Sequence, residues 1–426
     1  MTELPEGWEI RRLEDLCEPG KQAIVDGPFG SNLKRSDYVD SGIPVLKIQN
    51  IKENLITLKK MDYVSPDKYQ ELVRHSFTEG DIVMTKLGDP LGVSAIVNGI
   101  PNGLIVADLV RIRPSRVLTK FLCYQLNSPR IQKYINEQQK GTTRPRVNLA
   151  MIRELPIYKP PIEEQHKIVE LLEDHLSRLD AALADVKQAK VKAAQFRRSL
   201  LQAAFTGNLG SDGTRLMTDL PNGWNLKSLS SLVTLLSGFA YKSSDWKESG
   251  VPVLKITNVR NGRVRLEGCS YISKERATES KQFAVHNNDL LITMTGEIGA
   301  TGFYREEFEA RLNQRVGKLV VKEGEPLNLK YLAYFFESPE TRQVMWKLAK
   351  GIAQANISPK EILNLEIPLP PLPEQHKIVE ILEDHLSRLD ASIALADAIE
   401  KQSAGLRRSL LQASFNGQLT KEVASV

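Results

Sequence analysis

Along two stretches of the chain, apolar residues recur every three or four positions among polar ones, and each stretch predicts one long helix. No proline or glycine interrupts the first stretch before Gly207, and Gly405 is a weak point of the second. A stripe sustained over about six heptads is typical of a coiled-coil seam. The first stripe consists of Ile168, Leu172, Leu176, Leu179, Leu183, Val186, Ala189, Ala193, Phe196, Leu200 and Ala204. The second consists of Ile378, Leu382, Leu386, Leu389, Ile393, Ala396, Ile399, Leu406 and Leu410.

The beginning of this helix occurs twice, almost without change. Residues 164–180 read EQHKIVELLEDHLSRLD, and residues 374–390 differ only by Ile381 in place of Leu171. Each copy follows a pair of prolines and has acidic residues in its first turn, which favours a helix start. Neither helix can bury its stripe alone, so we expect the two copies to pair as a rod about 65 Å long, at about 1.5 Å per residue. A helical hairpin inside an ordinary domain is the alternative.

The rest of the chain is also repeated. The segment LPEGW at 4–8 returns as LPNGW at 220–224, and SGIPVLKIQNI at 41–51 returns as SGVPVLKITNV at 249–259. Short runs rich in Val and Ile, bounded by Gly, Pro and Asp, predict strands, and shorter helices are expected at 119–137 and 329–348. The chain is therefore interpreted as a tandem duplication of about 210 residues. The predicted fold class is α+β, with two globular domains and two long helices.

The repeat also predicts the domain boundaries. The segment between the first long helix and the second LPNGW-type start is rich in Gly, Ser, Asp and Thr, which is typical of a linker. We expect a globular domain at 1–157, a long helix at 158–208, a linker at 209–219, a second globular domain at 220–367, a second long helix at 368–420 and a tail at 421–426.

Composition and charge narrow the class of protein. The chain has 426 residues, of which 41% are hydrophobic and 26% charged, as in a globular protein of two or three domains. Its net charge of +5 permits nucleic-acid binding without requiring it. The three cysteines form neither a CxxC pair nor an even disulfide framework. Because the sequence also shows no signal peptide and no apolar run of about 18 residues, we expect a cytoplasmic protein.

The motifs of common enzymes are missing from the sequence. There is no GxxxxGK[ST] phosphate loop, no GxGxxG and no HExxH. His166 and His175 on the repeated helix are too far apart to share a metal ion in the usual way. We therefore predict no catalytic and no metal-binding residue in this chain. An enzyme built on scattered acids such as Asp81, Asp89 and Glu297 is the alternative.

The remaining candidate chemistry suits DNA. Ten Lys or Arg residues and a single acid, Glu137, lie between Leu109 and Arg153. Guanidinium and ammonium groups neutralise phosphates, Arg can contact guanine through two hydrogen bonds, and Gln or Asn can do so with adenine. In the loop at 140–148 the candidate DNA-binding residues are Lys140, Thr142, Thr143, Arg144, Arg146 and Asn148. In its counterpart they are Lys350, Gln354 and Asn356, so we expect the two halves to prefer different bases.

Three further sets of polar residues stand at matching places in the two halves. One set lies at 31–35 and 241–244, one in glycine-containing loops at 86–92 and 295–301, and one at the end of the repeated strand. Solvated loops and ordinary turns are the alternative explanation for each set. The candidate DNA-binding residues are Ser31, Asn32, Lys34, Arg35, Tyr241, Lys242, Lys86, Thr295, Lys47, Asn50, Lys255 and Asn258.

With these motifs assembled, the whole chain resembles the DNA-specificity subunit of Type I restriction–modification systems. The resemblance rests on the two LPxGW starts, the GIPVLKIQNI and GVPVLKITNV strands, the GDIVMTKLG and NDLLITMTG segments, and above all the repeated EQHKIVExLEDHLSRLD helix with its RRSLLQAxF end. It implies that each globular half is a target-recognition domain. It also implies that the duplicated helices form an antiparallel coiled coil, which sets the spacing of a bipartite, asymmetric DNA site.

The resemblance further implies which partners complete the system. Two modification subunits would bring S-adenosylmethionine and adenine-N6 methylation, and restriction subunits would bring ATP- and Mg-dependent translocation and cleavage, so this chain needs no cofactor of its own. The helix faces not used for the pair, together with the RRSLLQAxF ends, are expected to dock the modification subunits. The docking residues expected at these ends are Arg197, Arg198, Leu201, Arg407, Arg408 and Leu411. A coiled-coil scaffold whose globular ends bind protein is the alternative function, and salt-dependent DNA binding would separate the two.

Overall fold

The computed structural model describes residues 4–139, 145–206, 220–260, 262–351 and 355–416. Contacts divide the chain into two compact units, Met1–Val186 with Ala398–Val426, and Lys187–Asp397. Each unit therefore contains one globular domain together with one end of each long helix. Among the described residues, no helix is long and apolar enough to cross a membrane.

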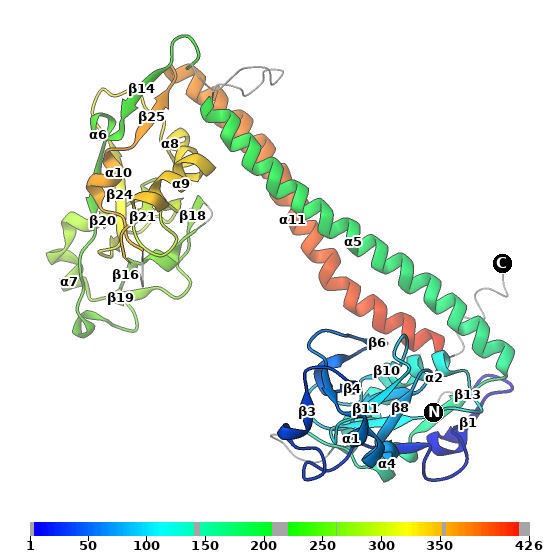
Figure 1. Ribbon diagram of the computed structural model, residues 1–426. Coiled ribbons are helices and arrows are strands. Elements are labelled where there is room, and N and C mark those ends of the chain that lie inside the picture. The colour runs from blue at the N-terminus through cyan, green and yellow to red at the C-terminus, as the bar shows by residue number, and fades with distance from the viewer. Residues whose placement is uncertain (1–3, 140–144, 207–219, 261, 352–354, 417–426) are drawn as a thin grey trace. The chain divides into compact units, whose positions relative to one another are not determined.

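The domain of the first unit is built on two sheets (Figure 1). One has the strand order β10-β9-β12-β2 and the other β3-β7-β4-β11-β8, and β11 pairs with β4 in parallel while the other pairs in these sheets are antiparallel. The strands are β1 (Glu9–Arg12), β2 (Ile24–Asp26), β3 (Tyr38–Val39), β4 (Ile43–Leu46), β5 (Ile51–Lys52), β6 (Leu55–Ile56), β7 (Asp62–Val64), β8 (Ser76–Thr78), β9 (Ile82–Thr85), β10 (Ser94–Ile96), β11 (Asn102–Ile105), β12 (Leu109–Ile112) and β13 (Pro156–Lys159). The helices are α1 (Pro66–Glu71), α2 (Thr119–Leu126), α3 (Pro129–Gln138), α4 (Leu149–Arg153) and α5 (Ile162–Thr206).

The second unit repeats this plan with a different strand count. Its sheets have the orders β15-β24-β21-β22-β18-β17 and β19-β16-β23-β20, and β16 pairs with β23 in parallel, as β4 does with β11. The strands are β14 (Asn225–Ser228), β15 (Val233–Ser237), β16 (Val251–Leu254), β17 (Val259–Arg260), β18 (Gly262–Val264), β19 (Ser270–Ile272), β20 (Ala284–Val285), β21 (Leu290–Thr293), β22 (Thr301–Phe303), β23 (Ala310–Leu312), β24 (Val316–Val321) and β25 (Glu366–Leu369). The helices are α6 (Leu229–Leu232), α7 (Lys274–Glu279), α8 (Leu329–Glu337), α9 (Pro339–Leu348), α10 (Pro359–Leu363) and α11 (Leu372–Ser414). The predicted α+β duplication is confirmed.

Each shorter helix predicted at 119–137 and 329–348 is in fact two helices. The break falls at a Ser-Pro pair in both domains, where the side chains of Ser128 and Ser338 cap the following helices α3 and α9. Proline cannot continue the hydrogen-bond ladder of the preceding turn, while a serine followed by proline is a favourable helix start. The prediction of one continuous helix was therefore wrong at this Ser-Pro turn, which both halves of the chain contain.

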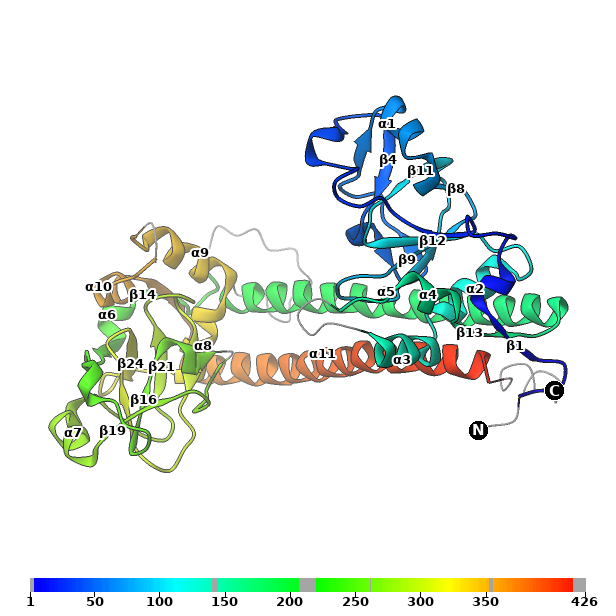
Figure 2. The ribbon, with the colours of Figure 1, turned by 90° about the horizontal axis from the view of Figure 1, so that it is seen from below.

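The two long helices run antiparallel, as the pattern of their contacts shows in each unit separately. In the first unit, Leu172 and Leu176 near the start of α5 share a core with Leu411 at the end of α11. In the second unit, Leu201 at the end of α5 shares a core with Leu382 near the start of α11. The helices lie side by side in both cases (Figure 2). The cores of both domains extend onto these helix ends, so domain and helix ends fold together.

The seam departs from the predicted apolar stripe in the C-terminal half of both helices. Phe196 is 49% exposed and Leu406 is 52% exposed, and Ala189 and Ile399 are also exposed. The half-buried positions are instead one residue further on, at Lys190, Arg197, Glu400 and Arg407. The prediction followed the apolar side chains, whereas the helical period places these longer polar side chains against the partner helix.

The polar positions of the seam form ion pairs between the helices. In the second unit Arg197 lies 2.9 Å from Asp390, and Lys190 lies 2.6 Å from Asp397. In the first unit Arg407 pairs with Asp180, which is the equivalent of the Arg197–Asp390 pair. Partly exposed pairs of this kind contribute little to stability, about 0–1 kcal/mol each, but they fix which positions face each other.

A buried glutamine fastens the start of each long helix to its own domain. Gln165 accepts a hydrogen bond from the backbone N–H of Leu118 at 2.9 Å and donates to the carbonyl of Pro160 at 2.8 Å. Gln375 accepts from Asn328 N–H at 2.8 Å and donates to the carbonyls of Pro326 and Pro370. Both side chains are completely or almost completely buried. The identity of the two copies at this glutamine therefore has a structural cause.

Replacing Gln375 by leucine is expected to destabilise the second unit while leaving the first unit intact. The substitution leaves a buried N–H and two carbonyls without their partner, at a cost of about 1–3 kcal/mol for each unpaired group. Calorimetry should show unfolding of the second unit shifted to lower temperature, whereas the matched substitution Glu374→Gln on the exposed side of the same turn should leave it in place. Equal melting of the two variants would contradict the role assigned to Gln375.

Candidate nucleic-acid interface

Two of the loops predicted to bind DNA lie against each other in the first domain. Val147 N–H donates to the carbonyl of Lys86 at 3.0 Å, and Gly88 N–H donates to the carbonyl of Pro145 at 2.9 Å. Leu87 and Arg146 form an antiparallel bridge between the two loops. The backbone of each loop thus holds the other in place, and the side chains of Lys86, Arg146 and Asn148 come together on one surface.

The same loop pairing recurs in the second domain. Ile357 N–H donates to the carbonyl of Met294 at 2.9 Å, and Thr295 forms an antiparallel bridge with Asn356. In the alignment of the two halves, Thr295 is the counterpart of Leu87 and Asn356 is the counterpart of Arg146. The backbone frame is therefore shared between the domains, while the side chains carried by that frame differ.

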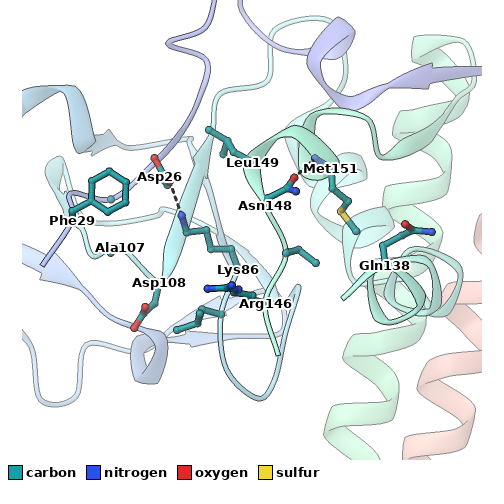
Figure 3. A pocket seen from close by; sticks show the side chains of 13 residues that line it. Asp26, Phe29, Lys86, Ala107, Asp108, Gln138, Arg146, Asn148, Leu149 and Met151 are labelled. Atoms are coloured by element: carbon teal, nitrogen blue, oxygen red, sulfur yellow. Dashed lines mark hydrogen bonds and ion pairs between the residues drawn. The ribbon is translucent and has the colours of Figure 1, made fainter. Parts of the chain in front are cut away.

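The paired loops of the first domain border a cavity of about 490 Å³ (Figure 3). Lys86 lies within it and pairs with Asp26 at 2.5 Å, so part of its charge is compensated. Arg146 is exposed at the cavity wall. Asn148 is also exposed but uses its side-chain oxygen to cap α4, accepting from Met151 N–H at 2.8 Å. Arg146 is thus the side chain with most freedom to reach a base or phosphate.

The counterpart residues of the second domain point inward instead. Thr295 is buried, and its hydroxyl lies 2.6 Å from the side-chain amide of Asn356. With the amide oriented to satisfy its neighbours, Asn356 also donates to the Met294 carbonyl at 2.8 Å and accepts from Arg315 at 3.0 Å. Both predicted contacts therefore act within the protein. Lys350 in the same loop is exposed, 3.5 Å from Glu361, and stays available to a ligand.

Several predicted residues lie outside the described part of the chain or in exposed turns. Lys140, Thr142, Thr143, Arg144 and Gln354 are outside the described residues. In both domains the next set surrounds the same short turn, in which the backbone N–H of Lys34 or Lys242 donates to an aspartate three residues later. The exposed members of this set are Ser31, Asn32, Lys34, Arg35 and Lys242.

Tyr241, the remaining member of that set, is half-buried. Its hydroxyl donates to Ser280 at 3.1 Å, and its ring packs against Trp246 and Phe239. Burial raises the pKa of this phenol. The side chain therefore contributes to an aromatic cluster of the second domain, and its ring is only partly accessible to a ligand.

The asparagines at the ends of the repeated strands have a structural role. Asn50 is fully buried, accepts from Lys47 N–H at 3.0 Å and donates to the carbonyl of Thr57 at 3.0 Å. Asn258 repeats this arrangement with Lys255 and Arg265. Such buried amides hold a turn and offer no edge to DNA. The neighbouring lysines are also engaged, Lys47 with Asp62 and Lys255 with Ser270 at 2.7 Å.

Part of the basic segment at 109–153 also belongs to the protein interior. Arg111 is buried and donates to the carbonyls of Ser76 and Gln22, and burial lowers its pKa. Arg113 pairs with the buried Asp81 at 2.8 Å. One of the acids of the alternative enzyme hypothesis is therefore the partner of an arginine. Counting charges along the sequence overestimated how many face solvent.

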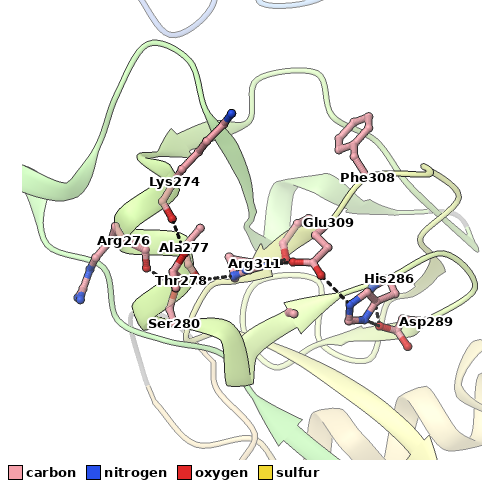
Figure 4. A network of polar contacts seen from close by, with 12 residues as sticks. Lys274, Arg276, Ala277, Thr278, Ser280, His286, Asp289, Phe308, Glu309 and Arg311 are labelled. Atoms are coloured by element: carbon pink, nitrogen blue, oxygen red, sulfur yellow. Dashed lines mark hydrogen bonds and ion pairs between the residues drawn. The ribbon is translucent and has the colours of Figure 1, made fainter.

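A cluster of titratable residues in the second domain is likewise internally paired (Figure 4). Glu309 lies 3.0 Å from Arg311 and 3.1 Å from His286, and the hydrogen bond from Arg311 is the main reason that the pKa of Glu309 is lowered. Asp289 pairs with Lys318 at 3.0 Å. Within the described ranges, no group of three or more His, Cys, Asp or Glu residues is placed to hold a metal ion.

The six predicted docking residues at the helix ends differ in accessibility. Leu201 and Leu411 are buried in the cores of their own units. Arg197 and Arg407 form the ion pairs of the helix seam described above, while Arg198 and Arg408 are exposed. Of this set, the two exposed arginines are the ones that a partner could reach in the folded chain.

The prediction missed Phe29, which lines the same cavity as Lys86 and Arg146. The predicted residues are polar or charged because such side chains contact phosphates and base edges, so an apolar residue is not among them. The available signal was a phenylalanine in a short stretch of Gly, Pro, Ser and Asn, where burial is not expected.

Comparison with known proteins agrees with the repeat. A sequence profile described as Type I restriction modification DNA specificity domain matches residues 5–191 and again 221–401. The chain is 26% identical over 309 residues to the Type I restriction enzyme EcoBI specificity subunit of Escherichia coli, an alignment that covers 68% of this chain and 63% of that protein. It is 24% identical over 420 residues to the MjaVIII specificity subunit of Methanocaldococcus jannaschii, covering 96% and 93% of the two chains.

A solved structure supports the fold. A chain from a structure described as showing complex assembly and conformational transition of the type I R-M system superposes with a TM-score of 0.75 at 20% identity, covering 98% of this chain and all of the other. At this level of identity the likeness concerns the fold. It agrees with the duplicated α+β domains and the long helices found here.

Replacing Arg146 by glutamine is expected to weaken specific DNA binding by about 5- to 150-fold, the range for losing one good base contact worth about 1–3 kcal/mol. The loss should be smaller at higher salt if the contact is to phosphate. Binding of labelled duplex measured by fluorescence anisotropy tests this, with Arg116→Gln as the matched control, because Arg116 is exposed but lies outside the cavity. Equal affinities for the two variants would remove Arg146 from the interface.

Proposed function

Since the chain belongs to the Type I restriction modification DNA specificity family, we propose that each of its two globular domains, at 1–157 and 220–367, reads one half of a split, asymmetric DNA site. The observation that carries this proposal is the recurrence of one backbone frame with different side chains. The paired loops present Arg146 in the first domain, where the second domain holds Asn356 inside. Two domains that share a fold but carry different side chains on the paired loops suit a DNA site whose two halves differ in sequence.

The long helices are the part of the chain suited to set the gap between the half-sites. α5 is continuous over 45 residues and α11 over 43, and each helix has its two ends in different units. A rod of about 65 Å corresponds to at most about 19 base pairs at about 3.4 Å each. The tilt and size of the domains will make the actual gap shorter.

The catalytic steps are assigned to partner subunits. Methylation would use S-adenosylmethionine bound to modification subunits, and cleavage would use ATP and Mg bound to restriction subunits. Of the acids in the alternative enzyme hypothesis, Asp81 is held by Arg113 inside the first domain, which supports a reading role for this chain. The scaffold alternative is less well supported, because the cavity that carries Lys86, Arg146 and Asn148 has the chemistry of a DNA contact.

A repeated exposed face on the long helices is the best-supported docking surface for two copies of one partner. We define this face by His166, Lys167, Glu170, Asp174 and Arg178 on α5, with the identical residues His376, Lys377, Glu380, Asp384 and Arg388 on α11. All ten are exposed. Packing explains identity at buried positions such as Gln165, but gives no reason for identity at exposed ones.

Exposed residues further along the same helices differ between the two copies, unlike those at the helix starts. Exposed positions there have diverged, for example Lys192 against Gln402 and Val191 against Lys401. The identity of the repeated exposed face is therefore not a general property of the helix surface. A pseudo-twofold chain that seats the same subunit twice needs the same contact surface at both places. This surface gives residues to the part of the predicted docking site that the helix faces outside the pair were expected to form, beside the exposed arginines at 198 and 408.

The experiment that tests the reading function is a map of modified bases. The chain is expressed with a modification subunit in a host without other adenine methylation, and methylated adenines are located by single-molecule sequencing. A single split motif with a fixed gap is expected. Methylation of a continuous motif by a purified, assembled complex would contradict reading by two separate domains.

Lengthening both long helices is expected to change the gap and leave the half-sites unchanged. Inserting one heptad into each helix, after Ala184 in α5 and at the facing position near Ser403 in α11, keeps the seam in phase. It adds about 10 Å at about 1.5 Å per residue, or about three base pairs. The methylated motif of the variant gives the result directly. New half-site sequences with the old gap would contradict the role of the helices as a spacer.

Reversing charge on the repeated exposed face is expected to prevent assembly with the modification subunits. The double variant Arg178→Glu with Arg388→Glu changes two exposed, equivalent residues, and should reduce co-purification of the modification subunit by at least tenfold while leaving the thermal unfolding of the chain unchanged. The control Lys192→Glu lies on the exposed, diverged part of α5. Loss of the partner in the control alone would place the contact elsewhere.

A further inference from the structure

We propose that Phe29 is a DNA-contacting residue of the first domain, whose ring stacks on a base at an opened base step in the first half-site. The inference rests on the DNA-reading function proposed above and adds to it a contact by an apolar side chain.

The exposure of Phe29 is unusual for this chain. The side chain is 77% exposed, which is the largest value for any large hydrophobic side chain in the described ranges. A single exposed apolar residue is common on protein surfaces and needs no special explanation. Phe29 differs from such residues in where its ring lies and in how its loop is held.

The ring lies at the cavity bordered by the paired loops. Phe29, Lys86, Arg146 and Asn148 line this one cavity, and Figure 3 shows that Phe29 belongs to the chain segment that follows Asp26 while Arg146 comes from the other side. A duplex contacting Arg146 would therefore bring its bases or backbone close to the ring. Aromatic side chains next to basic ones are the usual means of holding unstacked bases.

The backbone around Phe29 is constrained. Gly27 N–H donates to the carbonyl of Leu109 at 3.2 Å, and a Cβ atom at Gly27 would lie 2.2 Å from the carbonyl oxygen of Val106, so this position needs glycine. Pro28 fixes its own φ angle, and Asn32 N–H donates to the carbonyl of Phe29 at 2.8 Å, which closes a turn. The ring is thus presented by a loop that has little freedom left to lose on binding.

The loop that carries Phe29 is specific to the first domain. Gly238 is the counterpart of Gly27, since its N–H donates to Val316 as that of Gly27 does to Leu109, and Lys242 is the counterpart of Lys34 in the following turn. Lys34 follows Gly27 by seven positions, whereas Lys242 follows Gly238 by four. The first domain therefore has three additional residues here, and these extend the loop beside the cavity.

The surroundings of the ring favour DNA over a protein partner. The exposed neighbours of Phe29 along the chain are Gly30, Ser31 and Asn32, and Lys34 and Arg35 follow them. An apolar contact between proteins is usually surrounded by further apolar residues. The cavity wall also carries the apolar side chains Leu87, Leu149 and Met151, but the exposed ring itself stands among small polar and basic groups. This arrangement matches an apolar wedge between base pairs, with the basic side chains on the phosphates.

The test uses the complex with modification subunits and a duplex carrying its methylated motif. The fluorescent base 2-aminopurine is placed in turn beside the first half-site and at each of its adenines except the methylated one, because a methyltransferase itself flips its target base out of the duplex. Binding by the unaltered complex is expected to raise the fluorescence at one position, because unstacking removes quenching. Phe29→Ala should abolish this increase and weaken binding about 5- to 150-fold, the range for losing one base–aromatic stack, whereas Phe29→Tyr should retain both.

The control variant replaces a second exposed phenylalanine that lies away from the cavity. Phe308→Ala removes another exposed phenylalanine, 51% exposed and outside the cavity, and should change neither signal. The proposal is overturned if Phe29→Ala leaves both the fluorescence increase and the DNA affinity unchanged. It is also overturned if Phe29→Ala prevents assembly with the modification subunits while the complex that still forms shows the normal fluorescence increase. Failure of the reading function itself is distinguishable, because the unaltered complex would then methylate no split motif.

Discussion

The structure depends on one constraint: neither long helix can bury its apolar side alone. The two helices therefore pack against each other, antiparallel. Each domain then receives two helix ends, one from the helix that follows it and one from the other helix. In the first unit Phe121 of the domain packs on Phe415, with 5.4 Å between ring centroids. In the second, Phe205 at the end of α5 packs on Tyr331 at 5.0 Å. Domains and helices are therefore stabilised by the same cores.

Comparison of equivalent residues in the two halves distinguishes those kept for folding from those kept for binding. Identity at buried Gln165 and Gln375 follows from the hydrogen bonds that fasten helix to domain. Identity on the repeated exposed face has no such cause, and is assigned to a partner that binds twice. Divergence within a shared loop frame, at Arg146 and Asn356, is assigned to the recognition of two different sequences. The two repeats of this chain can thus be compared with each other position by position.

The repeat, the α+β domains and the paired helices were predictable from the sequence, because they depend on periodicity and on motifs written twice. The site was less predictable. Polarity marked Arg146 as a candidate, and the structure places it at an exposed cavity wall. Polarity also marked Asn50 and Asn258, which are buried and hold turns. A short polar side chain after a strand has the same appearance in both roles, and only the carbonyl groups that the fold brings near it decide between them. Phe29 was missed for the opposite reason, since its type suggests a core.

In the proposed function each domain reads its own half-site independently, and the helix pair only holds the two domains. A chimera tests this claim most directly. Residues 221–367 take the place of residues 5–157, so that the second domain occurs twice, and the methylated motif is mapped in cells. The helix starts that fasten the domains are nearly identical, so the chimera is expected to assemble and to methylate an inverted repeat of the second half-site with the gap unchanged. An assembled chimera that still methylates the original asymmetric motif, or that selects a sequence unrelated to either half-site, would contradict the claim.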